Sequence, residues 1–266
     1  MYVIKASGKK EEFNSDKIFR TLEKAGASKE LAMEIVSKVQ KKVHDGTTTK
    51  EILNSALRLL RNRNPVVCER YDLKRAIMSL GPTGFPFEKF FSRILENYGY
   101  KTEVGQIVKG RITRHEIDII AEKNSKRYMV ELKYHNSLGI YTRLKTVLYV
   151  YARFLDLKGK FDQPWIATNT KLSHQARRYA DGMHMKITSW EYPEGKSLSE
   201  MIDYKKLYPV TILKSVNKKI IHQLCKADMM LSKDLLDIDE KELMKRTNLS
   251  LEMVQRILKE ARQVCG

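Results

Sequence analysis

The stretch from His115 to Lys133 reads HEIDIIAEKNSKRYMVELK, and it decides the fold of the middle of this chain. In its first half the apolar residues Ile117, Ile119 and Ala121 alternate with acidic residues, which predicts a half-buried β-strand. The charged and polar run at positions 122–126 is typical of a hairpin loop. The second half alternates again, so the whole stretch predicts a β-hairpin.

Acidic and basic side chains fall on one face of this predicted hairpin. Asp118 can lie near Glu131 at one end of the sheet, and Lys133 projects from the same face as Glu131, since strand side chains repeat every two residues. Two carboxylates supply the hard oxygen ligands that Mg²⁺ prefers, and the ion would polarise a scissile phosphate and help ionise a water. Lys133 would orient or deprotonate that water, or neutralise charge in the transition state. The alternative is a surface hairpin with a solvated ion pair, worth roughly 0–1 kcal/mol.

Glu116-Ile117-Asp118 followed by Glu131-Leu132-Lys133 resembles the PD-(D/E)xK restriction-endonuclease core, in its Mrr-like and archaeal Holliday-resolvase-like branches. The resemblance covers roughly residues 84–203. It includes Gly84–Tyr100, which is similar to the first helix of that core, and Pro164–Ala180, which is similar to its late strand, turn and helix.

This resemblance implies a Mg²⁺- or Mn²⁺-dependent DNA endonuclease in which Glu88 joins Asp118 and Glu131 on the metal. For Glu88 the alternative is a first-turn glutamate that stabilises the helix dipole. Glu116 is either a further ligand or a solvent-facing residue. His115 and His135 flank the site and are expected to be solvent-exposed loop histidines, with replacement of a metal ligand as the alternative.

The composition favours a polyanionic partner. The chain of 266 residues carries 50 basic and 32 acidic residues, a net charge of +18. The excess is spread along the chain rather than confined to a tail, which predicts salt-sensitive binding to nucleic acid. A generally Lys-rich, solvated surface is the alternative. The 42% hydrophobic content is enough for real cores, and the length suits two to three domains.

The cysteines and the apolar runs exclude several classes. Cys68, Cys225 and Cys265 are odd in number and far apart, so a zinc ribbon is not supported and a reducing cytoplasm fits. No signal-like N-terminus and no apolar run of roughly 18 residues is present, so we expect a soluble, cytoplasmic protein without a membrane span.

The first 84 residues predict a short strand and glycine turn, possibly a hairpin with the Glu12-Phe13 stretch, and then four helices. Those helices are expected to begin near Asp16 and at Ser28 or Lys29, and then to cover Lys50–Asn62 and Val67–Ser79. The segments that carry a family resemblance are Val3–Lys5 with Gly8, Phe13–Ile18, Thr48–Ile52 and Tyr71–Ile77.

These segments resemble the ATP-cone, a small regulatory nucleotide-binding domain best known from ribonucleotide reductases and their repressors. The resemblance implies ATP or dATP as a regulatory ligand, with Val3, Ile4 and Lys5 facing the nucleotide and Lys17 and Arg20 on its phosphates. Lys17 also falls in the first turn of its predicted helix, where free N–H groups and the helix dipole favour anions. An ordinary four-helix unit with solvated lysines is the alternative.

A linker with two glycines and two prolines, Ser79–Pro86, precedes the central part. The central part predicts a helix over Phe87–Asn97, a strand over Tyr100–Ile107 and a helix over Tyr141–Asp156. We expect the last helix to bury Leu144, Val147, Leu148, Tyr151 and Phe154 or Leu155. Arg143 and Lys145 at its start are either near the site or solvated.

The last 62 residues predict a helix over Lys205–Gln223 that Pro209 interrupts, two short helices within Ser232–Arg246 and a final helix capped by Ser250. Asn248 suits a left-handed position in the turn before that cap. The pattern resembles helix-hairpin-helix domains, which implies contact with a DNA phosphate. A plain helical bundle for dimerisation is the alternative.

Together these features predict an α/β chain of three domains. An α-helical ATP-cone-like domain covers residues 1–84, an endonuclease-like mixed sheet flanked by helices covers 85–203, and a small all-α domain covers 205–266. The expected activity is cleavage of double-stranded or branched DNA by a homodimer, since two sites suit two strands. A non-catalytic, nucleotide-responsive DNA-binding protein is the second hypothesis, and RNA remains open as a substrate.

Overall fold

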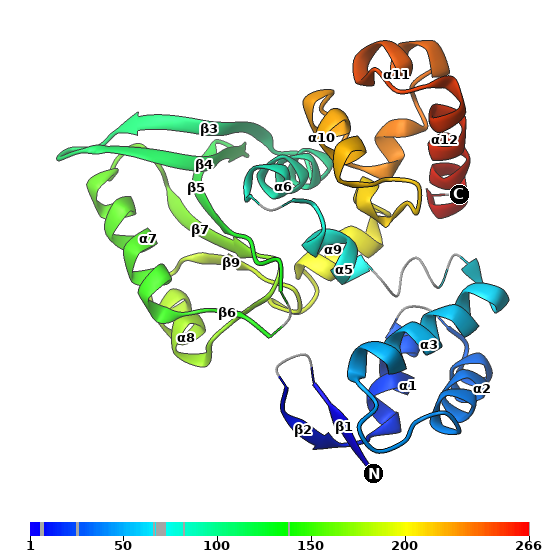
Figure 1. Cartoon of the computed structure of the whole chain (residues 1–266). Helices are drawn as coiled ribbons and strands as arrows, with labels where there is room; N and C mark the ends of the chain where they lie inside the picture. Colours follow the sequence, from blue (N-terminus) through cyan, green and yellow to red (C-terminus); the bar gives the residue numbers. More distant parts are fainter. Residues whose placement is uncertain are drawn as a thin grey trace. The chain divides into compact units, whose positions relative to one another are not determined.

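The computed structural model describes residues 1–5, 8–24, 27–65, 67, 73–81, 83–137 and 139–265. The chain divides into two compact units, Met1–Leu73 and Lys74–Gly266. Figure 1 shows helices only beside one hairpin in the first unit, and a sheet flanked by helices followed by further helices in the second. The predicted mixed α/β class is confirmed.

The first unit begins with the predicted hairpin. Strands β1 (Tyr2–Ile4) and β2 (Lys10–Glu12) pair in antiparallel fashion. Helices α1 (Ser15–Lys24), α2 (Lys29–Gln40) and α3 (Thr49–Arg63) follow, close to their predicted bounds. Their inner faces bury one apolar core, whose fully buried members include Leu22, Ala32, Ile35, Val39, Ala56 and Leu60.

Local capping explains where two of these helices start. The Ser28 hydroxyl accepts from the backbone N–H of Leu31 at the start of α2. Thr48 and Glu51 form a capping box at the start of α3, in which each side chain accepts from the other residue's backbone N–H.

Only part of the fourth predicted helix, Val67–Ser79, falls within the described residues. It forms α5 (Leu73–Met78), and all of it after Leu73 belongs to the second unit. Residues 66 and 68–72, including the predicted Tyr71, lie outside the described residues.

The second unit is built on a five-stranded sheet of order β3-β4-β5-β7-β9. Its strands are β3 (Lys101–Lys109), β4 (Arg114–Lys123), β5 (Lys126–Lys133), β7 (Gln163–Thr168) and β9 (Lys186–Thr188). The first three are antiparallel and the last three are parallel. The β4–β5 pairing confirms the hairpin that the alternating pattern predicted, with Lys123 opposite Lys126 at the turn.

Helices cover both faces of this sheet (Figure 1). On one face, Phe87 and Phe91 of α6 (Phe85–Asn97) lie in a group of aromatic contacts that includes Trp165 of β7. On the other face, α7 (Leu144–Asp156) and α8 (His174–Gly182) pack against the sheet. A short parallel pair, β6 (Tyr141–Thr142) and β8 (Lys171–Leu172), flanks them.

The predicted inner face of α7 was partly wrong. Leu148 and Leu155 are 42% and 49% exposed, whereas Val150 and Arg153 are buried with Val147. The helix begins at Leu144 rather than Tyr141, because residues 141–142 pair as a strand, and its buried stripe follows the spacing 147, 150, 153.

The C-terminal part is all helical: α9 (Leu198–Tyr204), η1 (Val210–Ile212), α10 (Lys218–Lys226), η2 (Ser232–Leu235), α11 (Glu240–Thr247) and α12 (Leu251–Cys265). Pro209 interrupts the helix predicted over Lys205–Gln223, as expected, but the break is larger than predicted. Pro209 is extended, only the short η1 follows it, and α10 starts after its Asn217 cap. Asn248 is left-handed as predicted, with φ of 54°. None of the described helices is long and apolar enough to cross a membrane.

Salt bridges attach the C-terminal helices to α6. Lys89 lies 3.0 Å from a carboxylate oxygen of Asp228, and Arg93 lies 2.9 Å from one of Asp234. These contacts help to make residues 74–266 one compact unit.

Candidate active site

The end of the β4–β5 hairpin brings the predicted carboxylates together. The pairing of β4 with β5 ends at Ile119 and Val130, so Asp118 and Glu131 both lie just beyond the paired segment, close enough for the charge of Glu131 to raise the pKa of Asp118. The backbone N–H of Leu132 donates to Asp118 Oδ2 at 2.6 Å. Lys133 Nζ lies 2.8 Å from Glu131 Oε1, so all three predicted residues meet at this end of the strands.

An arginine that the sequence analysis missed holds the other oxygen of Glu131. Arg153 of α7 lies 2.5 Å from Glu131 Oε2, and the two residues are 7% and 4% exposed. The signal for Arg153 was present, because it falls three residues after Val150 on the buried stripe of its helix. A cation at an apolar position of a helix that covers an acidic strand end is a candidate partner for that acid.

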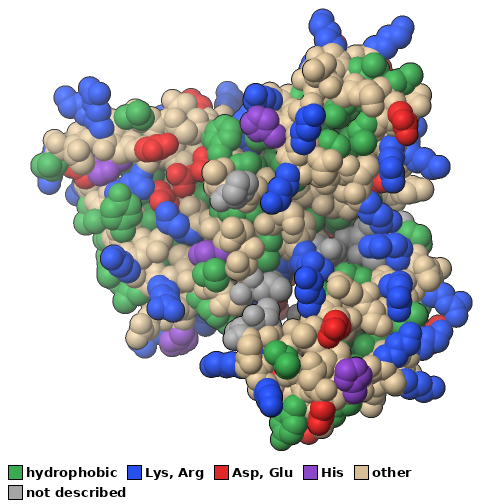
Figure 2. All heavy atoms as spheres, in the orientation of Figure 1, with side chains coloured by type: hydrophobic (Ala, Val, Ile, Leu, Met, Phe, Trp, Pro, Cys, Tyr) green, Lys and Arg blue, Asp and Glu red, His purple; other side chains and the backbone are tan. Residues whose placement is uncertain are grey.

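Glu88 of α6 also joins this acidic group electrostatically. Its pKa is raised to about 7, first by burial and then by the charges of Asp118, Glu116 and Glu131, while Lys133 opposes the rise. The pKa of Asp118 is raised to about 6, first by burial and then by the charge of Glu131. The hydrogen bond from the Leu132 N–H opposes this rise. Glu116 itself is exposed to solvent. Figure 2 shows Asp and Glu side chains gathered over these strands, among Lys and Arg.

This donor set fits a divalent cation in its chemistry. Carboxylates whose pKa values are raised by burial and by one another become stable anions when a cation lies between them. Within the part of the chain that the structure describes, no three Asp, Glu, His or Cys side chains are already arranged around one ion position. Each oxygen of Glu131 accepts from one cation, Lys133 or Arg153, so a metal ion would bind through the remaining lone pairs of these oxygens.

The two flanking histidines are not free loop residues. His115 Nε2 lies 2.8 Å from Asp156 Oδ2, at the end of α7. His135 Nδ1 lies 2.9 Å from the Thr170 hydroxyl, and burial followed by the charge of Lys133 lowers its pKa. The expectation of solvent-exposed histidines was therefore wrong, because both lie in hydrogen-bonded networks that support the strand ends. Arg143 and Lys145 are both exposed.

Two of the predicted nucleotide-binding residues, Lys5 and Lys17, lie around one carboxylate of the first unit. Lys5 and Lys17 approach Glu11 Oε2 at 2.7 Å and 3.0 Å, and both lysines lower the pKa of that carboxyl, Lys5 the more. Val3 is buried, Ile4 donates its backbone N–H to Thr47 at 3.0 Å, and Arg20 is exposed. The structure thus brings Lys5 and Lys17 together at the hairpin.

Three family models match consecutive parts of the chain. They are described as "ATP cone domain" over residues 1–78, "Restriction endonuclease" over residues 82–202 and "AF1548-like, C-terminal" over residues 208–265. A protein of Archaeoglobus fulgidus, described as "Uncharacterized protein", is 40% identical over 176 residues, which are 66% of this chain and 99% of the relative. The chain belongs to the AF1548-like family.

The AF1548-like relationship extends to a solved structure. The crystal structure described as "Protein of Unknown Function AF1548" superposes with a TM-score of 0.64 and 37% identity, over 69% of this chain and 99% of that chain. A structure described as Can2 from Sulfobacillus thermosulfidooxidans in complex with cyclic tetra-adenylate has 11% identity and a TM-score of 0.32, over 65% of this chain and 50% of that one. That second likeness is too low to carry an argument.

These matches confirm the two resemblances that the sequence carried for its first 202 residues. The chain has an ATP-cone domain and a restriction endonuclease-like domain, which indicates a nuclease. The helix-hairpin-helix likeness of the C-terminal helices remains a prediction, as do the exact domain boundaries and the roles of the individual site residues.

Proposed function

We propose that this AF1548-like protein is a divalent-metal-dependent endonuclease that hydrolyses phosphodiester bonds of double-stranded or branched DNA. One observation supports this above the others. Within a restriction endonuclease-like domain, Asp118, Glu131 and Lys133 meet at one end of a hairpin. Glu88 lies close enough for the charges of these carboxylates to raise its pKa.

Asp118, Glu131 and Glu88 would hold Mg²⁺ or Mn²⁺ through their carboxylate oxygens. When bound, the ion polarises the scissile phosphate and helps to ionise the attacking water. Lys133 is 37% exposed at its side chain, so its ammonium can orient that water or oppose the negative charge of the transition state. The Leu132 N–H keeps Asp118 oriented by holding Oδ2.

The first unit would regulate this activity with ATP or dATP, through Val3, Ile4 and Lys5 on the base side and Lys17 and Arg20 on the phosphates. In this proposal the bound nucleotide displaces Glu11, which now neutralises Lys5 and Lys17. A homodimer would present two sites to the two strands of a duplex.

One contact favours the alternative of a DNA-binding protein without turnover. The buried Arg153 pairs with Glu131, which neutralises one metal-binding carboxylate from inside the protein. If the Arg153–Glu131 pair persists when the protein is bound to DNA, the endonuclease-like domain would hold DNA without cutting it, as a clamp.

The deciding experiment measures cleavage of linear, nicked and branched DNA with Mg²⁺ or Mn²⁺, comparing wild type with Asp118→Asn. The substitution keeps the size of the side chain and a hydrogen-bond acceptor for the Leu132 N–H. We expect cleavage to fall by at least about two orders of magnitude, because the site loses a carboxylate that would hold the metal ion. DNA affinity, measured by fluorescence anisotropy, should stay within about threefold of wild type.

Glu103→Gln is the matched control, since Glu103 is an exposed carboxylate of β3 in the same sheet. It should leave both cleavage and DNA binding unchanged. Equal cleavage by wild type and Asp118→Asn would refute the mechanism, and DNA binding without metal-dependent cleavage by wild type would establish the clamp.

A further inference from the structure

A pocket lies at the end of the five-stranded sheet that is opposite the carboxylate site. Its volume is about 510 Å³, and Lys186 at the start of β9 projects into it. Tyr128, close to Lys186, stands five positions before Lys133 on β5, a separation of roughly 17 Å along a strand. The pocket is therefore distinct from the carboxylate site.

Three aromatic rings surround the ammonium of Lys186. Its Nζ lies 3.6 Å from the ring centroid of Trp165, 4.9 Å from that of Tyr128 and 5.0 Å from that of Tyr100. It donates a hydrogen bond to the Tyr100 hydroxyl at 2.7 Å. The rings fix the position of the cation while its remaining donors are not committed to a carboxylate.

Positive charge predominates among the described residues that line this pocket. Lys123 and Lys196 stand beside Lys186, and the one acid of the lining, Asp181, accepts from the Tyr192 hydroxyl at 3.0 Å. The pKa of Lys186 is lowered to about 8, first by burial and then by the charges of Lys196 and Lys123. Three ammonium groups that repel one another in a half-enclosed cavity would be stabilised by an anion.

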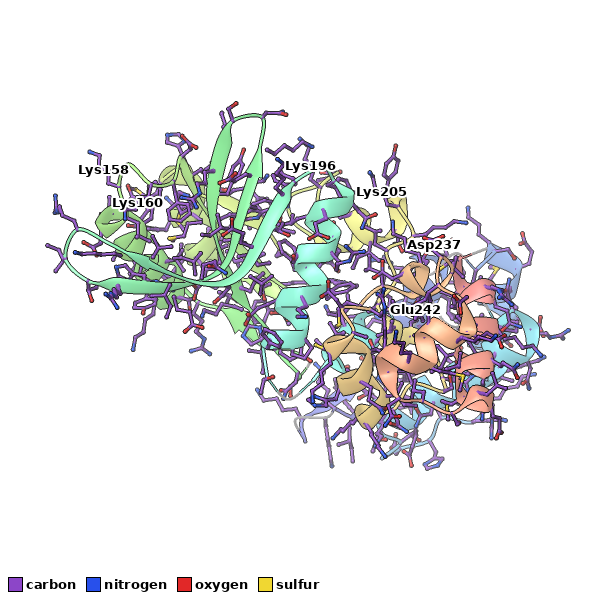
Figure 3. The ribbon with its side chains drawn as sticks, turned by 90° about the horizontal axis from the view of Figure 1, so that it is seen from above. Lys158, Lys160, Lys196, Lys205, Asp237 and Glu242 are labelled. Atoms are coloured by element: carbon purple, nitrogen blue, oxygen red, sulfur yellow. The ribbon has the colours of Figure 1, made fainter. Side chains whose placement is uncertain are left out.

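The walls also offer flat apolar surface. Tyr98 and Tyr192 line the pocket, each half-buried, from the end of α6 and from the loop after β9. Figure 3 shows Lys196 and Lys205 on the same side of the molecule, and the ammonium of Lys205 lies 4.7 Å from the ring centroid of Tyr98. Aromatic rings beside clustered ammonium groups suit a ligand that is planar at one end and anionic at the other.

We propose that this pocket, lined by Lys123, Lys186 and Lys196, binds a small anion that carries an aromatic ring, of the nucleotide class. The phosphate would lie among the three ammonium groups and the base against the tyrosine rings. The ligand can be a free mononucleotide or the phosphorylated end of a nucleic-acid strand, which have the same chemistry. The proposal does not depend on the metal-dependent cleavage proposed above.

The fluorescence of Trp165 reports this pocket directly. The chain has two tryptophans, so Trp190→Phe in the full-length protein leaves Trp165 as the single emitter. We titrate this protein with a nucleoside 5′-monophosphate, inorganic phosphate, the unphosphorylated nucleoside and a 5′-phosphorylated dinucleotide. The monophosphate or the phosphorylated dinucleotide should change the emission at lower concentration than phosphate or nucleoside alone. Tighter binding of the monophosphate indicates a free mononucleotide as the ligand, and tighter binding of the dinucleotide indicates the phosphorylated end of a strand.

Charge removal tests the site without unfolding it. In the same background, Lys196→Met and Lys186→Met should each weaken binding at least about tenfold, because each removes a charge-assisted hydrogen bond to phosphate. Lys196 is exposed, so its replacement leaves the core intact. Lys158→Met replaces an exposed lysine two residues after α7, away from Lys196 in Figure 3, and should leave the affinity unchanged.

Protonation gives an independent readout. Because the anion favours the charged form of Lys186, affinity should fall as the pH rises from about 7 to about 9, and this fall should be smaller in Lys186→Met. No emission change with any ligand at millimolar concentration would overturn the proposal. Equal affinity of wild type and Lys196→Met would overturn it too.

Discussion

At the scale of single residues, the state of Glu131 governs what the carboxylate site can do. Its two oxygens face two cations, Arg153 from inside the protein and Lys133 from the strand end. Breaking a buried ion pair by removing one partner leaves an uncompensated charge in the interior, which costs more than the pair itself contributes.

We therefore expect Arg153→Met to lower the free energy of unfolding of the second unit by about 3–5 kcal/mol. The measurement is urea unfolding followed by tryptophan fluorescence, because both tryptophans lie in this unit. Arg246→Met, which removes an exposed pair with Glu242, should cost about 0.5 kcal/mol. A loss below about 1 kcal/mol for Arg153→Met would contradict a buried charge that depends on Arg153.

The raised pKa values of Glu88 and Asp118 predict a pH dependence of stability. The pKa values are about 7 for Glu88 and about 6 for Asp118 in the folded protein, against ordinary values of 4.5 and 3.8. Between these values the folded state keeps protons that the unfolded chain has released. The contribution of these groups to the free energy of unfolding is therefore largest below about pH 4, and it is lost as the pH rises through about 6 to 7.

Unfolding of wild type and Glu88→Gln at a series of pH values checks this. The difference between the two proteins should change between pH 4.5 and 7, with wild type losing stability relative to the variant, and Mn²⁺ should restore it at pH 7 more than at pH 4.5. Parallel pH profiles would mean that Glu88 is not held in this acidic group.

At the scale of elements, the tip of the β3–β4 hairpin is held by the end of α7. The Asp156 carboxylate accepts from the backbone N–H of Ile112 at 2.7 Å and of Thr113 at 3.1 Å, besides its contact with His115. Gly110 lies against this carboxylate, where a Cβ would come within 2.1 Å of Asp156 Oδ2 and 2.8 Å of the Thr113 carbonyl. A side chain here would have to displace both the carboxylate and the turn.

Gly110→Ala should consequently destabilise the second unit by about 1–3 kcal/mol, as overpacking does in other cores. Gly182→Ala is the matched control, because an added Cβ there meets nothing within 4 Å and the position lies at the end of α8. Urea unfolding compares the two variants. If Gly110→Ala were as stable as Gly182→Ala, the hairpin tip would not be clamped by Asp156.

At the scale of the whole molecule, the net charge of +18 sets how the protein meets a polyanion. Lys and Arg side chains are spread widely over the visible surface in Figure 2. Neutralising DNA phosphates with such side chains releases counterions, so affinity depends steeply on salt.

If about four phosphates are neutralised, Kd for duplex DNA should rise roughly 150-fold between about 50 and about 200 mM salt. Fluorescence anisotropy across that range gives the slope. Asp118→Asn should show the same slope as wild type, because it removes no cation. A salt-independent Kd would exclude the phosphate backbone as the main contact.

Much of the architecture followed from local patterns. Alternation of apolar and charged residues predicted the β4–β5 hairpin and the common face of Glu131 and Lys133, because strand side chains repeat every two residues. Cap residues such as Ser28 and Thr48 placed helix starts within about two residues, since capping is satisfied by neighbours in the chain. In α7, apolar spacing placed Leu148 and Leu155 on the inner face, although both are exposed, and it missed the buried Arg153.

The sequence by itself determined which residues share a strand face, where most helices begin and that the chain is strongly basic, since these depend on short-range periodicity, caps and composition. Only the tertiary structure decided that Arg153 forms an ion pair with Glu131, that the charge of Asp118 raises the pKa of Glu88, and that Lys186 lies among three aromatic rings. Those contacts join residues 21 to 86 positions apart. Their distances are set by how α6 and α7 pack on the sheet, which no local pattern specifies.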